Sequence, residues 1–226
     1  MRTKTLLIAA TALAVGIGSS LAQTYSQNIV GYVNQVLPAN AYSLLVAPLA
    51  NTTTNNAEQI LTCLQTGDEV LFFNGSGYNF DVYIGPGTWI DGVSGNPINA
   101  PLLPPGVGFF YQTGAGVQET NTAVGVVVLT NSIALPLNSY NLVGSTAPIA
   151  GSVESTNFSL PLQTGDQVLI YNGSGYNFDV YISPGSWIDG VSGNPIAVPT
   201  VTVGQGFFYQ TGAGVTEQWN QNVVVQ

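Results

Sequence analysis

The chain contains one stretch of sequence twice, at positions 98 residues apart. Residues 64–116 and 162–214 agree at 41 of 53 positions without a gap. Upstream, residues 37–63 and 135–161 agree at only 5 of 27 positions in the same register. Two copies of this length indicate a duplicated domain, because a solenoid needs three or more short repeats. We therefore expect two homologous domains in tandem, each of about 98 residues.

Each copy has the pattern of an all-β domain. Short apolar runs are bounded by Gly, Pro and Asn, as is typical of strands joined by turns. Asn74-Gly-Ser-Gly77 predicts a hairpin turn, since Asn and Gly adopt positive φ at low cost. The strands predicted in the first copy are Ile29–Val33, Tyr42–Val46, Glu69–Phe73, Tyr78–Ile84, Gly108–Gln112 and Gly125–Leu129, and only residues 55–63 look helical. An antiparallel β-sandwich or a small barrel is expected for each unit.

The N-terminus has the features of a secretory signal peptide. Arg2 and Lys4 precede an apolar run at residues 5–15, and small residues follow before Gln23. We expect a mature protein that is secreted to the extracellular space or the cell surface. The expected divisions are a signal peptide at 1–22, a first β domain at 23–128 and a second at 129–226. No later stretch approaches the roughly 20 apolar residues of a spanning helix, so membrane insertion is not expected.

After residue 4 the chain has no Lys, Arg or His, whereas Asp and Glu together number 11. Nucleic-acid binding rests on cationic side chains and is therefore not expected. A His base, a Lys Schiff base and a Ser-His-Asp triad are excluded for the same reason. Paired carboxylates could hydrolyse glycosides, but such a pair duplicated in two small domains is not expected. The sequence therefore predicts a protein that is not an enzyme.

Several motifs occur in an order that resembles a known group of proteins. They are Ser26-Gln-Asn-Ile-Val-Gly-Tyr-Val-Asn34, Leu37-Pro-x-x-x-Tyr-Ser-Leu44, Thr66-Gly-Asp68 and Pro105-Gly-x-Gly-Phe-Phe110. Together they resemble a family of secreted, duplicated all-β proteins of environmental bacteria of the verrucomicrobial type. The resemblance implies an exported bacterial β protein, and it implies no catalytic residues.

The terminal strands bear on assembly. Both Ile29–Val33 and Val223–Val225 are apolar, and neither contains a basic residue that would discourage edge-to-edge pairing. Two arrangements are open: each strand pairs inside its own domain, or it adds to a second molecule and builds a filament. The first predicted function is a non-enzymatic structural protein of the cell surface or extracellular matrix, with self-association through these strands.

The repeated blocks also concentrate side chains that suit sugar binding. Aromatic rings stack on sugar rings, while carboxylate and amide groups hydrogen-bond to hydroxyls. The alternative predicted function is therefore a carbohydrate-binding protein with two equivalent sites for a polysaccharide. The candidate ligand-binding residues are Tyr78, Asn79, Asp81, Trp89, Asp91 and Asn96, with Tyr176, Asn177, Asp179, Trp187, Asp189 and Asn194 in the second copy. The competing interpretation places Trp89 and Trp187 in the core, where large aromatic residues dominate burial.

One repeated loop could bind a metal ion. Asp91-Gly-Val-Ser-Gly-Asn96 and its copy offer hard oxygen ligands, which suit Ca²⁺. The candidate ligands are Asp91, Ser94, Asp189 and Ser192. The alternative is a turn in which the Asp side chain accepts hydrogen bonds from backbone N–H groups. No other cofactor is expected.

Overall fold

The structure is a computed structural model that describes residues 29–51, 55–114, 116–212 and 214–223. The expected signal peptide, and Val224 and Val225 of the expected terminal strand, lie outside the described residues. Among the helices of the described part, none has the length and apolar character needed to cross a bilayer.

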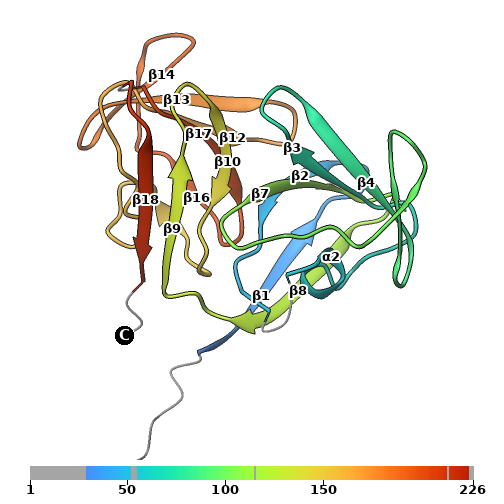
Figure 1. Ribbon diagram of the computed structural model, residues 1–226. Coiled ribbons are helices and arrows are strands. Elements are labelled where there is room, and N and C mark those ends of the chain that lie inside the picture. The colour runs from blue at the N-terminus through green and yellow to red at the C-terminus, as the bar shows by residue number, and fades with distance from the viewer. Residues whose placement is uncertain (1–28, 52–54, 115, 213, 224–226) are drawn as a thin grey trace, which may run out of the picture.

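The fold is all-β and contains two similar units, as the repeat predicts. The first unit contains β1 (Val30–Leu37), β2 (Tyr42–Val46), α2 (Ala57–Ile60), β3 (Glu69–Phe73), β4 (Tyr78–Gly85), β5 (Thr88–Asp91), β6 (Pro97–Ile98), β7 (Gly108–Gln112) and β8 (Glu119–Val126). The second contains β9 (Thr130–Leu135), β10 (Tyr140–Gly144), β11 (Gly151–Ser152), β12 (Gln167–Tyr171), β13 (Tyr176–Ser183), β14 (Ser186–Asp189), β15 (Pro195–Ile196), β16 (Thr200–Val201), β17 (Gly206–Gln210) and β18 (Glu217–Asn222). Figure 1 shows the units side by side, one coloured blue to green and the other yellow to red.

Each unit has an open six-stranded antiparallel sheet and a separate two-stranded ribbon. The sheet orders are β2-β7-β3-β4-β5-β6 and β10-β17-β12-β13-β14-β15, and the ribbons are β1-β8 and β9-β18. Neither sheet closes into a barrel. The second unit also has a short β11-β16 pair, where the first unit has a single bridge between Asn56 and Leu102.

The core of each unit lies between the sheet and its ribbon. Leu37 of β1 packs with Trp89 and Tyr111 of the first sheet. In the second unit, the ribbon residues Leu135 and Trp219 pack with Trp187 and Tyr209 of the sheet. The ribbon therefore covers one face of the sheet, which gives each unit a sandwich-like section.

The terminal strands pair inside their own units. β1 is antiparallel to β8 from the pair Val30–Val126 to the pair Leu37–Glu119, and β18 is antiparallel to β9. β18 ends at Asn222, so Val223 of the predicted strand Val223–Val225 lies after it and not within it. The predicted strand Gly125–Leu129 differs from the structure, because β8 ends at Val126 and residues 127–129 form a link to β9. The first four residues of β8 are polar, and its apolar residues do not form an unbroken run. The sequence pattern therefore did not predict the full length of this strand.

The two units meet through a pseudo-two-fold interface. The bridge between Leu45 and Gln205 has its counterpart, shifted by 98 residues in opposite directions, in the bridge between Val107 and Val143. The hydrogen bond from Val46 N to Gly204 O (2.9 Å) is likewise matched by that from Gly144 N to Gly106 O (3.2 Å). An interface in which each contact occurs twice is isologous, as in a symmetric dimer.

A third apolar cluster fills this interface. Leu44 and Phe110 of the first unit pack with Leu142 and Phe208 of the second. The same strands supply the core of each unit from their alternate positions, so the central strands are apolar on both faces.

Candidate functional site

Four pockets lie in a row along the boundary between the units. The two central pockets have volumes of about 290 and 170 Å³, and the two end pockets about 480 and 310 Å³. Neighbouring pockets share pairs of aromatic residues, which in order are Tyr42 with Tyr171, Tyr78 with Tyr176, and Phe73 with Tyr140. We refer to these four pockets as the seam row.

The seam row follows the pseudo-two-fold symmetry. Tyr78 and Tyr176 occupy the same position in the two copies, and their hydroxyl oxygens lie 3.4 Å apart at the centre of the row. They are 40% and 39% exposed, so part of each ring is open to solvent. These tyrosines begin β4 and β13, which directly follow the repeated hairpin turns.

Phe110 and Phe208 organise the rings around them. Phe110 makes edge-to-face contacts with Tyr42, Tyr78 and Tyr171, at centroid distances of 6.1, 5.5 and 5.2 Å. Phe208 does the same with the equivalent residues, and its contact with Phe73 has a centroid distance of 5.1 Å. Edge-to-face contacts fix ring orientation, so the open ring faces form a preorganised surface.

The seam row is electrically neutral. None of the described residues that line its four pockets is Asp, Glu, Lys, Arg or His. Burial, followed by the hydrogen bond with Tyr78, raises the pKa of Tyr176, and burial also raises that of Tyr42. The phenols therefore stay protonated at neutral pH and act as hydrogen-bonding groups without charge.

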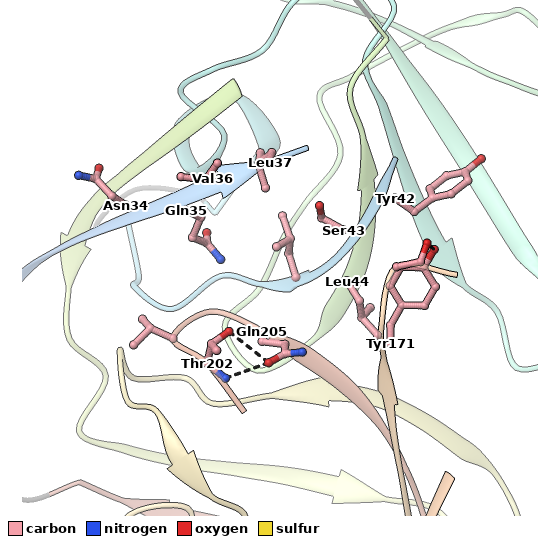
Figure 2. Close-up of a pocket in the computed structure, with 13 residues that line it drawn as sticks. Asn34, Gln35, Val36, Leu37, Tyr42, Ser43, Leu44, Tyr171, Thr202 and Gln205 are labelled. Atoms are coloured by element: carbon pink, nitrogen blue, oxygen red, sulfur yellow. Dashed lines mark hydrogen bonds between the residues drawn. The ribbon is translucent and has the colours of Figure 1, made fainter. Parts of the chain in front are cut away.

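The largest of these four pockets, which we term the polar end pocket, lies between β1, β2 and a loop of the second unit. Figure 2 shows Gln35 turned toward Thr202 and Gln205 across it, with Tyr42 and Tyr171 near one another at the other side. The side-chain oxygen of Gln205 accepts hydrogen bonds from the backbone N (2.9 Å) and the hydroxyl (3.1 Å) of Thr202. Gln35 Nε2 donates to Gly204 O at 3.1 Å. These carboxamides are thus held in place by the protein itself.

The sequence-predicted sugar residues are brought together only in part. Tyr78 and Tyr176 lie in the seam row, as described above. The side-chain oxygens of Asn79 and Asn177 instead accept hydrogen bonds from Asn74 and Asn172 (3.1 and 3.0 Å) in the hairpin turns. The two asparagines therefore support the turns that precede β4 and β13.

The two predicted tryptophans cannot contact a ligand, which corrects their assignment as sugar-stacking residues. Trp89 is 0% exposed and Trp187 is 1% exposed. Trp89 Nε1 donates to Glu58 Oε1 at 2.9 Å, and Trp187 Nε1 donates to Glu154 Oε1 at 2.6 Å. The interpretation that places both rings in the core is therefore confirmed, because their hydrogen-bonding capacity is satisfied inside the protein.

The predicted metal loop forms a turn in both units. Asp91 Oδ1 accepts hydrogen bonds from Val93 N (3.0 Å) and Ser94 N (2.6 Å), and the pKa of Asp91 is lowered chiefly by the bond from Ser94. Ser94 Oγ accepts from Asn96 N. The same bonds recur in the copy, with Asp189, Ser192 and Asn194 in the corresponding places.

Asp91 also faces a second carboxylate across the strand pair. Asp81 is opposite Asp91, and Asp179 is opposite Asp189. Burial and then the neighbouring carboxylate raise the pKa values of Asp81 and Asp179. Within the described ranges, no group of three or more His, Cys, Asp or Glu is placed to hold a metal ion.

A buried cluster that was not predicted lies under each sheet. In the first unit, Tyr111 Oη lies 2.5 Å from Asp68 Oδ2 and 2.7 Å from Glu119 Oε2. Backbone N–H groups of Gln65 and Gly114 also donate to Asp68. A phenol has one proton, so hydrogen bonds to both carboxyl groups require a second proton on one of them.

The second unit repeats this cluster as Asp166, Tyr209 and Glu217. In both clusters the other glutamate oxygen, Oε1 of Glu119 or Glu217, is buried without a hydrogen-bond partner. Burial raises the pKa of Glu217 above its usual range. All six residues are nearly inaccessible, so the clusters are structural and do not contact a ligand.

Cys63 lies beside the first cluster. Its sulfur is 3.8 Å from Tyr111 Oη, and burial raises the pKa of the thiol to about 12. The thiolate is the reactive form of cysteine, and the raised pKa favours the less reactive thiol form of Cys63 at neutral pH.

Most residues of the seam row were missed because they come from both copies. A signal was present in runs such as Val70-Leu71-Phe72-Phe73 and Phe109-Phe110-Tyr111, which are apolar at successive positions. Such runs indicate strands covered on both faces, and the second cover here is the other unit. In comparisons with known proteins, no family model, curated protein or solved structure matches this chain.

Proposed function

We propose that the protein binds an uncharged carbohydrate chain in the seam row and does not act on it chemically. The observation that supports the proposal is the continuous order of the four pockets, in which tyrosine rings line the centre and uncharged polar groups line the ends. The C–H faces of a sugar pack on aromatic rings, while its hydroxyls bond to amides and hydroxyls. A site with these two kinds of group needs no charge on the ligand.

The proposal includes a secreted, non-enzymatic setting for this binding. Glycoside hydrolysis uses two carboxyl groups on either side of the scissile bond. No described residue that lines the seam row has a side-chain carboxyl group. The proposed role is therefore to hold a glycan, as a surface or matrix protein does.

Affinity electrophoresis against a panel of neutral polysaccharides tests the proposal. Tyr42→Ala and Tyr140→Ala remove rings that border an end pocket and a central pocket. Each substitution is expected to weaken binding by roughly tenfold or more, as for a buried aromatic contact. Tyr32→Ala is the matched control, because Tyr32 is exposed on β1 and lines none of these pockets. Absence of binding to every polysaccharide, or equal binding by all three variants, would contradict the proposal.

A second candidate function is the structural, self-associating role, and the β1-β8 ribbon favours it. Its outer face exposes Tyr32 (65%), Val36 (63%) and Val124 (52%). The equivalent positions in the second unit are Thr130, Ala134 and Asn222, so the fold does not require apolar residues there. Among the described strands, β1 and β18 each have a single hydrogen-bonded neighbour, which leaves an edge for a strand of a second copy.

Sedimentation velocity over a range of concentrations tests this second candidate. The wild type is expected to associate, and the triple substitution Tyr32→Thr, Val36→Ala and Val124→Asn is expected to prevent it. The variant places the second unit's own residues on the first ribbon, so the fold should tolerate them. A wild-type protein that remains monomeric at every concentration would exclude the role.

A further inference from the structure

The two ends of the seam row differ in chemistry although they are equivalent by symmetry. Gln35 and Gln205 line the polar end pocket. The residues at the same positions of the other copy, Ile133 and Val107, line the pocket at the opposite end, which we term the apolar end pocket. The duplication thus supplies two versions of one site, and only the first has glutamines at these two positions. Asn141 of the apolar end pocket stands at the position of Ser43, and its Nδ2 donates to the backbone oxygens of Ser139 and Tyr209.

The polar end pocket is organised to hydrogen-bond a ligand. The oxygen of Gln205 is held by two hydrogen bonds from Thr202, which fixes the plane of the carboxamide. Gln35 is held by Gly204 O. Groups that are ordered before binding lose little conformational entropy when a ligand arrives, so these amides suit recognition of hydroxyl groups.

The rest of the seam row suits an apolar group. The central pockets are lined by aromatic rings and by Leu71 or Leu169, and their polar side-chain atoms are tyrosine hydroxyls. Beyond them, Val107 is an exposed aliphatic residue beside Ile133 and Leu142. A ligand made only of sugar would place hydroxyls against this surface, where few groups hydrogen-bond to them.

We infer that the ligand is an uncharged amphiphilic glycoside, bound in one orientation. Its sugar occupies the polar end pocket, and an alkyl or aryl aglycone extends over the central pockets toward Val107 and Ile133. This inference rests on the proposed carbohydrate-binding function and specifies the ligand class for the same site. Gln35 and Gln205 are then the residues that select the sugar end.

Isothermal titration calorimetry with methyl, butyl, hexyl and octyl β-glucosides and β-galactosides, all below their micelle concentrations, tests the inference on the wild-type protein. Affinity is expected to rise along the alkyl series of one sugar, by up to about fourfold for each fully buried methylene. Equal affinity for the methyl and octyl glycosides, or no binding of any glycoside, overturns it. If neutral polysaccharides still bind in electrophoresis, the proposed function survives that result.

Two exchange variants locate the ends of the ligand. Gln35→Ile with Gln205→Val gives the polar end the residues of its counterpart, and is expected to weaken octyl glycoside binding at least roughly tenfold. Val107→Gln with Ile133→Gln is the matched reverse exchange, and is expected to remove the gain from lengthening the alkyl chain. Unchanged affinity in Gln35→Ile with Gln205→Val, together with loss of binding in Tyr42→Ala, would overturn the inferred orientation. The seam row would then still be the binding site.

Discussion

At the residue scale, the most unusual feature is a phenol placed between two buried carboxyl groups in each unit. Tyr209 bonds both Asp166 and Glu217, and the second oxygen of Glu217 is buried without a partner. Burying a second negative charge beside Asp166 is costly, whereas a protonated Glu217 can donate to the phenol oxygen. The folded state therefore favours the acid form of this side chain, in agreement with its raised pKa.

This arrangement predicts a specific pH dependence of stability. Between the ordinary pKa of 4.5 and the raised pKa of the folded state, the unfolded chain has largely lost the proton of Glu217 while the folded protein largely retains it. The folded state then binds more protons, so the free energy of unfolding falls as pH rises through this range. Glu217→Gln, a neutral isostere, is expected to reduce that fall. Urea denaturation at a series of pH values measures it, and identical pH profiles for both proteins would contradict the prediction.

Other carboxyl groups bear on the same profile. The raised pKa values of Asp81 and Asp179 add to the fall at higher pH. The lowered pKa values of Asp91 and Asp189 act in the opposite sense, since their contribution is lost as pH drops below the ordinary value of 3.8. The comparison of Glu217→Gln with wild type removes these shared contributions.

At the scale of secondary-structure elements, two different segments perform one task. Glu58 in α2 and Glu154 in a turn after β11 each accept a hydrogen bond from a buried tryptophan and from the backbone of the neighbouring glycine. Their separation is 96 residues, not the 98 of the repeat, and the segments around them share almost no sequence. Both units therefore have the same glutamate–tryptophan hydrogen bond, although the segments that supply the glutamate differ in sequence.

Removal of the Glu58 carboxylate should leave the indole N–H of Trp89 buried without a partner. Glu58→Ala is expected to lower the free energy of unfolding by about 1–3 kcal/mol. Glu154→Ala should produce a similar loss in the second unit. Glu58→Gln is the control, because its amide oxygen can still accept the indole hydrogen bond and the loss should be smaller. Equal unfolding free energies for Glu58→Ala and wild type would contradict the prediction.

The repeat and the apolar patterns predicted the all-β fold, the two units and most strands. They did not predict β5, because Thr88–Asp91 is too short to stand out from the adjacent turn, so a ligand-binding and a core position both stayed open for Trp89. Tyr78 and Tyr176 were candidate residues, but the offset of 98 says nothing about which surfaces of two copies meet. Phe73 and Tyr171 are at equivalent positions of the repeat, but the repeat does not show that each ring packs on a phenylalanine of the other unit.

At the scale of the whole molecule, close backbone approach holds the two units together. A Cβ atom added at Gly206 would lie 2.9 Å from Leu45 O and 3.3 Å from Leu44 Cγ, across the interface. Since the nearest atom is part of a strand backbone, it cannot easily move aside. The glycine is therefore required by the contact between units and not by its own backbone conformation.

Gly206→Ala is expected to destabilise the protein by roughly 1–3 kcal/mol through this overlap. Gly77→Ala is the control, because a Cβ atom there meets nothing within 4 Å. Chemical denaturation compares the two variants. Equal unfolding free energies would show that the interface can open without cost to the fold.

The short link between the units has a consequence for the path of the chain. Val127 N donates to Ile29 O at 2.8 Å, and Val223 N donates to Leu129 O at 2.7 Å. The first and last described residues are therefore bonded to the same three-residue link, and Figure 1 shows that β1 begins and β18 ends near it. The backbone traces an almost closed loop, in which either unit could come first. A circular permutant opened at residue 128, with Val223 joined to Ile29 by a short linker, would retain every strand pairing described above.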